Sequence, residues 1–386
     1  MCSSDLPAGL RVQPLRARRP RKWLGEVLLW WEDLRYARSS RLVVLVLLVL
    51  VAGLAGSRLL RRPPATPEAA PTAAAAGAPG PGDAPAEATR PAPALLPPLA
   101  SPSAAAPNAA PRAAPAAAQG VIVFHSAQET PDTLQLYLMR ADGSGLRRIP
   151  GTPRYAAYPR LSPDGARVAF VGNDGAGDDL YTIGLDGAGL TRVTRGPGAS
   201  RFPAWSPDGK RLAFGSDRDG NWELYTVGVD GGNPTRLTSA PADDDLPAWS
   251  PDGQWLAFQS DRGRGTMHLY KMRADGTEVT PLTQGSGNDR YPAWSPDGTR
   301  LAFYSDRAAG LDQIFLVDAD GTHETQLTRS SGRDQLPAWS PDGRWVVFAS
   351  ERDGGWGIYA TRVEGGAQTL LAKQPYAWAP SWGAGR

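Results

Sequence analysis

Few residues of this chain carry the chemistry of catalysis or metal binding. Cys2 is the only cysteine, so an intrachain disulfide and a cysteine-based metal site are excluded. His125, His268 and His323 are the only histidines, and a three-histidine metal site would need them to converge. Each falls in a different repeat of the pattern described below, so we expect scattered structural or surface histidines. We predict no metal site, no cofactor and no catalytic residue.

One acidic stretch superficially resembles a calcium loop. Residues 217–223 read Asp-Arg-Asp-Gly-Asn-Trp-Glu. An EF-hand loop needs twelve residues, a terminal bidentate Glu and flanking helices, which a hairpin cannot supply. Asp and Gly are also the residues of tight turns, where Asp caps the turn and Gly adopts positive φ. We interpret this stretch as a turn.

The charge of the chain is sorted along its length. Residues 1–62 hold 12 Lys or Arg and 4 Asp or Glu, whereas residues 120–386 hold 27 and 32. The part with core-forming residues is therefore slightly acidic, and we predict no nucleic-acid partner.

The N-terminal part indicates a membrane anchor. Residues 42–57 contain no charged side chain and follow a basic stretch. We predict a basic cytoplasmic segment over 1–41 and a transmembrane signal-anchor helix over 42–60, with the rest of the chain extracytoplasmic. The alternative is a cleaved signal peptide, which would leave a secreted or periplasmic protein. Both interpretations export the rest of the chain.

A biased segment separates this anchor from the remainder. Residues 63–119 contain 24 Ala and 15 Pro and no aromatic residue. Proline prevents a stable helix, and the apolar bulk is too small to offset the entropy of ordering. We predict a disordered linker over 61–119 that holds a domain away from the bilayer.

The chain repeats from residue 120 onward. Ser-Pro-Asp-Gly begins at 162, 206, 250, 295 and 340, at intervals of 44 or 45 residues. Each turn is followed by a Phe, then by a Leu-Tyr or similar pair, and then by an acidic residue with Gly. Each unit therefore reads as four short strands, and a period of this length is typical of a propeller blade. Residues 121–149 match strands two to four of a sixth blade, and 379–382 match its first strand. We predict an all-β, six-bladed β-propeller over 120–386, closed by pairing of its N- and C-terminal segments.

The repeat unit resembles the WD-like repeat of TolB-type β-propellers. Residues 203–238 carry the pattern almost completely, from Pro-Ala-Trp-Ser-Pro-Asp-Gly to Leu-Thr. TolB has an α/β domain before its propeller, and here an anchor and a linker take that place. The resemblance implies an extracytoplasmic propeller of a kind often used to bind proteins or peptides. Related propellers also precede the catalytic domain of prolyl-oligopeptidase-type peptidases, but the Gly-x-Ser-x-Gly nucleophile turn of that domain is missing here.

Candidate binding residues come from the alternation of strand direction. Turns after strands one and three share one face and are nearly identical, whereas the connections after strands two and four share the other face and vary. Recognition needs unlike chemistry at equivalent positions, so we place a partner on the variable face. Arginines there are suited to carboxylates, and the acidic loop 243–245 to a basic group. The candidates are Tyr158, Arg160, Arg201, Phe202, Asp244, Asp245, Arg290, Tyr291, Gln335 and Trp378. Arg160 is either a channel-lining ligand or a filler paired with a neighbouring Asp.

These observations favour a non-catalytic module that binds a protein or peptide of the cell envelope. Two alternatives remain open. One is an enzyme, a lyase or hydrolase, acting on an envelope glycan or small molecule in the central channel. The other is a passive spacer.

Overall fold

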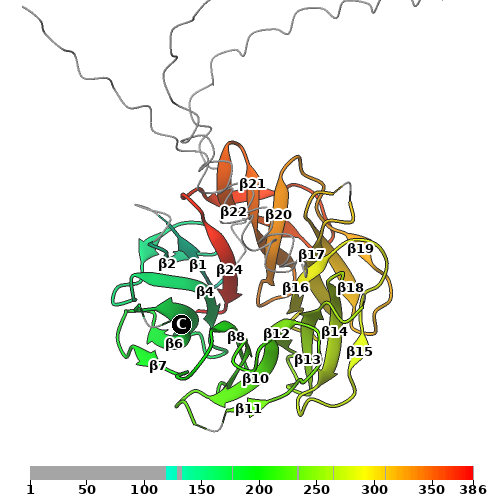
Figure 1. Ribbon diagram of the computed structural model, residues 1–386. Coiled ribbons are helices and arrows are strands. Elements are labelled where there is room, and N and C mark those ends of the chain that lie inside the picture. Colours follow the sequence, from blue (N-terminus) through cyan, green and yellow to red (C-terminus); the bar gives the residue numbers. More distant parts are fainter. Residues whose placement is uncertain are drawn as a thin grey trace, which may run out of the picture. The chain divides into compact units, whose positions relative to one another are not determined.

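The computed structural model describes residues 119–385, except 128–132, 176, 233, 264 and 309 (Figure 1). The cytoplasmic segment and the anchor helix predicted over 1–41 and 42–60 lie outside the described residues, as does the linker up to residue 118. Within the described part, we find no helix with the length and hydropathy needed to span a membrane.

Six four-stranded antiparallel sheets make up the described residues. The first blade has β24 (Trp378–Gly383), β1 (Val121–Ser126), β2 (Gln135–Arg140) and β3 (Arg147–Arg148), and the second has β4 (Tyr155–Leu161), β5 (Arg167–Asn173), β6 (Asp178–Gly184) and β7 (Thr191–Arg192). The third has β8 (Ser200–Trp205), β9 (Arg211–Ser216), β10 (Glu223–Gly228) and β11 (Thr235–Arg236), and the fourth has β12 (Asp244–Trp249), β13 (Trp255–Ser260), β14 (His268–Arg273) and β15 (Thr280–Pro281). The fifth has β16 (Asp289–Trp294), β17 (Arg300–Ser305), β18 (Gln313–Asp318) and β19 (Thr325–Gln326), and the sixth has β20 (Arg333–Trp339), β21 (Trp345–Arg352), β22 (Gly355–Arg362) and β23 (Thr369–Ala372).

The inner strands of the six blades form a closed ring. Contacts link β4 to β8, β8 to β12, β12 to β16, β16 to β20, β20 to β24 and β24 to β4. In this ring β4 and β16 belong to opposite blades, three steps apart in either direction.

The two ends of the propeller complete one blade together. Strand β24 pairs antiparallel with β1, with Val121 opposite Gly383 and His125 opposite Trp378, and Figure 1 shows the two strands side by side. The Trp382 indole Nε1 also donates to the Gln119 carbonyl at 3.0 Å. This pairing covers the edge of β1 that β2 leaves open. The predicted six-bladed propeller and its closure are confirmed.

Each blade has the same aromatic core. A fully buried Phe on the second strand stacks on a Tyr or Phe on the third, with ring centroids 5.7–6.2 Å apart in all six blades. Three tryptophans at the ends of inner strands, Trp205, Trp294 and Trp339, donate from Nε1 to a carbonyl of the previous blade at 2.9–3.2 Å. The repeated aromatic residues therefore build the scaffold.

Candidate functional site: the variable face

The two faces of the propeller differ in their turns. In the first Ser-Pro-Asp-Gly turn, Ser162 Oγ donates to Asp164 Oδ1 at 2.6 Å and the Gly165 amide donates to the Ser162 carbonyl at 2.8 Å. The other four turns repeat this arrangement. We call this the repeat-turn face. The opposite face, the variable face, carries the loops that connect each outer strand to the next inner strand.

Every inner strand has an irregularity at the same place. The register with the second strand shifts around the inner proline. The residue before that proline has a φ of 50–60° in all six blades, namely Tyr158, Phe202, Leu246, Tyr291, Leu336 and Ala379. Such bulges change the direction in which side chains point. A non-glycine residue adopts this left-handed conformation only where the surrounding structure stabilises it. Five of these residues belong to one hydrophobic cluster, and the sixth, Phe202, packs against it, so we infer that they converge on the axis of the ring.

Arg160 contacts Tyr291 of the opposite blade. The Arg160 Cζ lies 4.8 Å from the centroid of the Tyr291 ring, a distance suited to a cation–π contact. The two residues sit on β4 and β16, so the contact crosses the axis. Arg160 Nη1 also donates to the Pro159 carbonyl at 3.2 Å. The contact that the structure shows for Arg160 is with an aromatic ring, whereas the filler role was expected to pair it with an Asp.

His125 supports the bulge of the neighbouring blade. Its Nδ1 accepts a hydrogen bond from the Tyr158 amide at 3.2 Å. Burial, helped by the positive charge of Arg160, lowers the pKa of His125 from 6.5 to about 3. The neutral ring is therefore held as an acceptor. This is a structural role.

Arg201 pairs with a carboxylate of the preceding blade. Its Nε donates to Asp178 Oδ2 at 2.6 Å, and its Nη2 contacts the same oxygen. The guanidinium also lies over the Trp222 ring, 5.6 Å from its centroid. The side chains of Arg201 and Asp178 are 19% and 12% exposed. Arg201 thus lies in a neutral pair beside an aromatic ring.

Five aromatic side chains follow one another around part of the opening of the central channel on the variable face, which we call the mouth. Successive ring centroids lie 5.8 Å apart from Trp356 to Trp378, 6.2 Å from Trp378 to Tyr158, 4.8 Å from Tyr158 to Phe202 and 6.4 Å from Phe202 to Trp222. We call these five residues the aromatic arc. Phe202, Trp222 and Trp378 are partly exposed. The arc presents apolar surface that spans four blades.

The acidic candidates lie inside the propeller. Asp244 and Asp245 are fully buried. Asp244 Oδ2 accepts from Arg262 Nη2 at 2.5 Å. Burial raises the pKa of Asp244, opposed by the hydrogen bonds and charge of Arg262 and by a hydrogen bond from Ser260. The structure therefore gives the Asp244 carboxylate an internal arginine partner.

The last two candidates lie near a second acid. Gln335 Nε2 donates to Asp312 Oδ2 across the blade boundary. Burial raises the pKa of Asp312, opposed by the Gln335 hydrogen bond and by the positive charge of Arg290. Arg290 lies at the equivalent position on β16, next to Tyr291. Gln335, Asp312 and Arg290 therefore make this part of the mouth polar, in contrast to the aromatic arc.

The other two histidines also have carboxylate neighbours. His268 Nδ1 lies 3.1 Å from Asp289 Oδ2, and the exposed His323 lies 2.8 Å from Asp318 Oδ2. The three histidines do not converge, and the described residues hold no group of three His, Cys, Asp or Glu side chains suited to a metal ion.

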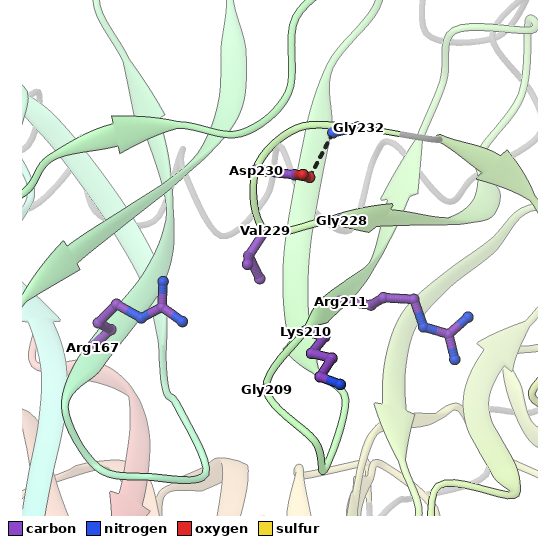
Figure 2. Close-up of a pocket in the computed structure, with 8 residues that line it drawn as sticks. All are labelled: Arg167, Gly209, Lys210, Arg211, Gly228, Val229, Asp230 and Gly232. Atoms are coloured by element: carbon purple, nitrogen blue, oxygen red, sulfur yellow. Dashed lines mark hydrogen bonds between the residues drawn. The ribbon is translucent and has the colours of Figure 1, made fainter.

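A shallow hollow of about 530 Å³ lies on the repeat-turn face between the second and third blades (Figure 2). Arg167, Lys210, Arg211 and Asp230 line it, together with Val229 and the glycines at 209, 228 and 232. The guanidiniums of Arg167 and Arg211 lie over the Trp205 and Trp249 rings, 5.1 and 5.2 Å from the centroids. These arginines therefore contribute to packing between blades.

The sequence analysis missed several residues of the mouth. They occupy the position two residues before each Leu-Tyr or equivalent pair, directly before or at the start of the third strand. The six residues there are Leu134, Asp178, Trp222, Met267, Asp312 and Trp356. Their differing chemistry across the repeats was a readable signal, since scaffold positions of this chain repeat and these do not.

The fold and the mouth together define the class: a six-bladed β-propeller built from one repeated unit, with one invariant face and one variable face. The family model of the TolB beta propeller domain matches residues 122–291 and 283–385. The chain belongs to this family.

Solved structures show the same fold. TolB from Acinetobacter baumannii is similar with 22% identity and a TM-score of 0.61, over 68% of this chain and 66% of that chain. A chain of a nidogen/laminin complex has 10% identity and a TM-score of 0.54, over 69% and 100% of the two chains. Hydrazine synthase from Kuenenia stuttgartiensis has 16% identity and a TM-score of 0.54, over 67% and 48%. The chain thus spans slightly less than two thirds of the TolB structure. A comparison with curated proteins finds no match.

Proposed function

We propose that this protein is a non-catalytic module that binds a protein or peptide through its variable face. The aromatic arc is the observation that carries the proposal. Aromatic side chains are enriched at the centres of protein interfaces because they bury a large area with few rotatable bonds. Membership of the TolB propeller family supports the same class of function, because propellers of this type often bind proteins.

The arrangement at the axis bears on the enzyme alternative. A small substrate in the central channel would need the space where Arg160 and Tyr291 meet. Asp244 and Asp245, from the predicted acidic loop 243–245, begin β12 and are buried, so their carboxylates are not presented to a substrate. The observations therefore favour a partner that lies across the mouth over a substrate held inside the channel.

We further propose that a single N-terminal anchor over 42–60 holds the propeller outside the cytoplasm, so that the partner is a protein of the cell envelope. The uncharged run after a basic segment supports this topology. A reporter enzyme that is active only outside the cytoplasm, fused after Gly385, tests it. Activity of the fusion supports export, and an inactive but stable fusion refutes it. The size of the mature chain distinguishes the anchor from a cleaved signal peptide.

Affinity capture from the source organism tests the binding role. The full chain is compared with Trp222→Ala, which removes a partly exposed ring of the arc. The matched control is Trp255→Ala, since Trp255 is a partly exposed tryptophan at the opposite end of its blade, stacked against Arg273 and Lys271. We expect one protein to be retained by the native chain and the control and to be lost with Trp222→Ala. A partner lost equally with both variants would refute the assignment to the variable face.

A further inference from the structure

A glycine leaves room for the shallow hollow on the repeat-turn face. In every blade the first residue of the second strand lies opposite the last residue of the third strand. In the fourth blade this pair is Trp255 with Arg273, whose Cζ lies over the indole 4.0 Å from the ring centroid, and the sixth blade repeats the arrangement. In the third blade the pair is Arg211 with Gly228, so no side chain fills the space beside Arg211.

Three cationic side chains border this hollow. Figure 2 shows Arg167 on one side of it and Lys210 and Arg211 on the other. Within the described residues, these three side chains form no ion pair and no hydrogen bond. The matching arginine of the fifth blade, Arg300, lies opposite Asp318 and so has a negative charge beside it. The hollow therefore gathers positive charge that the fold does not neutralise in the same way.

The two arginines are held by their flat faces. The Arg167 guanidinium lies over Trp205, with its Cζ 5.1 Å from the ring centroid, and Arg211 lies in the same way over Trp249. A cation–π contact occupies the face of a guanidinium, whereas its N–H groups lie in the plane and remain donors. Lys210 is exposed, and its ammonium moves on a flexible stem. Arg167 and Lys210 can therefore approach one ligand from two sides.

The acids beside the hollow cap their own turns. Asp230 Oδ1 accepts a backbone amide of its turn at 2.9 Å. Asp208 Oδ1 accepts from the Ser206 hydroxyl at 2.5 Å and from the Lys210 amide at 3.0 Å. These hydrogen bonds, and the charges of Lys210 and Arg211, lower the pKa of Asp208. The three cations outnumber these two acids, so positive charge remains for a ligand.

We propose that this hollow binds a phosphate-bearing ligand, with Arg167 and Lys210 as direct donors and Arg211 adding positive charge beside them. A phosphate group carries up to two negative charges and three acceptor oxygens, so it can contact a guanidinium and an ammonium together. The volume of about 530 Å³ is typical of small-molecule sites, so a phosphate ester fits better than a lone ion. The site lies on the face opposite the aromatic arc and is independent of the proposed function.

The phosphate group has two possible sources, a soluble ester and a phospholipid headgroup. The second is considered because the chain enters the propeller on this face, where Val121 begins β1 as Arg167 begins β5. The experiment below distinguishes the two sources.

Isothermal titration calorimetry with the full chain in an uncharged detergent tests the proposal. The probe is glycerol 3-phosphate, and the control is glycerate, which has a similar skeleton but a single carboxylate. We expect glycerol 3-phosphate to bind at least about tenfold more tightly than glycerate, and its affinity to fall as salt is added.

Variants of the two donors assign the site. Arg167→Gln and Lys210→Gln should each weaken binding of the probe about tenfold, because each removes a charged donor. The matched control is Arg300→Gln, since Arg300 lies over Trp339 at 5.5 Å in the same repeat position and does not border the hollow. It should bind the probe like the native chain and show a thermal unfolding midpoint similar to that of Arg167→Gln. Lys210→Gln removes no ring contact and should keep the native midpoint.

The source of the phosphate group is tested with the full chain in vesicles of phosphatidylcholine, with or without phosphatidylglycerol. Loss of probe binding only in the vesicles with phosphatidylglycerol would identify a lipid headgroup as the ligand. Equal binding in both would identify a soluble ester.

Several results would overturn the proposal. They are no binding of glycerol 3-phosphate, equal binding of glycerate, an affinity that salt does not change, or equal losses with Arg300→Gln and Arg167→Gln. Lys210→Gln should still capture the protein partner of the variable face, so failure of the phosphate site leaves the proposed function intact.

Discussion

Replacing Arg262 with Met tests how the acidic candidates are held inside the propeller. The Arg262 guanidinium lies over the Phe258 and Tyr270 rings, 5.3 and 5.1 Å from their centroids, and pairs with the fully buried Asp244. Met keeps the apolar stem and removes the charge. Removing one partner of a buried ion pair leaves an uncompensated charge, so we expect a loss of about 3–5 kcal/mol in the free energy of unfolding at pH 7.

The chain provides a matched control one blade away. Arg218 lies over the Phe214 and Tyr225 rings at 5.5 and 4.7 Å, but at the place of Asp244 it meets Ser200, which accepts from its Nη2 at 3.3 Å. Arg218→Met loses the cation–π contacts and the hydrogen bonds to the Ser216 and Ser200 hydroxyls without leaving a buried carboxylate unpaired. We expect this substitution to cost about 1–2 kcal/mol.

Urea unfolding followed by circular dichroism measures both variants at pH 7 and at lower pH. Asp244 has a pKa raised above its unfolded value of 3.8, so the folded state binds the proton more tightly, and acidification favours folding at this site. Loss of Arg262 raises this pKa further. The deficit of Arg262→Met should therefore shrink as the pH falls through the folded pKa, and that of Arg218→Met should not. Equal costs for the two variants, at all pH values, would refute the assignment of a buried Asp244–Arg262 pair.

Further predictions follow from the same structure. The imidazole of His125 should show no titration in NMR spectra between pH 8 and 5, and an NMR titration midpoint near 6.5 would contradict its burial. Its contribution to stability should decrease as the pH falls from 6.5 towards 3, because only the unfolded state takes up the proton in this range. Arg160→Met should lower the free energy of unfolding by about 1–2 kcal/mol through loss of the contact with Tyr291 and leave partner capture unchanged; loss of capture would make Arg160 a ligand. Truncation after Ala377 removes β24 and exposes the edge of β1, so we expect loss of cooperative thermal unfolding and aggregation; a monomer with native stability would contradict closure by the termini.

The repeats carry almost all the information about the fold. Five complete units in register predicted the strand count. The partial units at 121–149 and 379–382 predicted the closing blade, because 379–382 match the one strand that the unit 121–149 lacks. Because the same Asp-Gly turn residues recur in each unit, the ends of the strands could be predicted from short stretches of sequence.

The site was less accessible from sequence. The variable face was inferred from the variation of its loops, but the depth of a side chain depends on packing that periodicity does not encode. Asp244 belongs to a run of three aspartates, which is typical of a surface loop, but it is buried against Arg262. Trp222 and Trp356 stand two residues before the Leu-Tyr or Ile-Tyr pair of a third strand, and both lie at the mouth. The contact between Arg160 and Tyr291 joins opposite blades, more than 120 residues apart, so no local pattern predicts it.

The central claim is that the variable face carries the partner. Site-specific photo-crosslinking in living cells measures this directly, with a benzophenone amino acid placed at Trp222 in one strain and at Trp255 in another. We predict a discrete crosslinked protein from position 222 and none from position 255. A crosslink from position 255 alone would place the partner on the repeat-turn face and contradict the account.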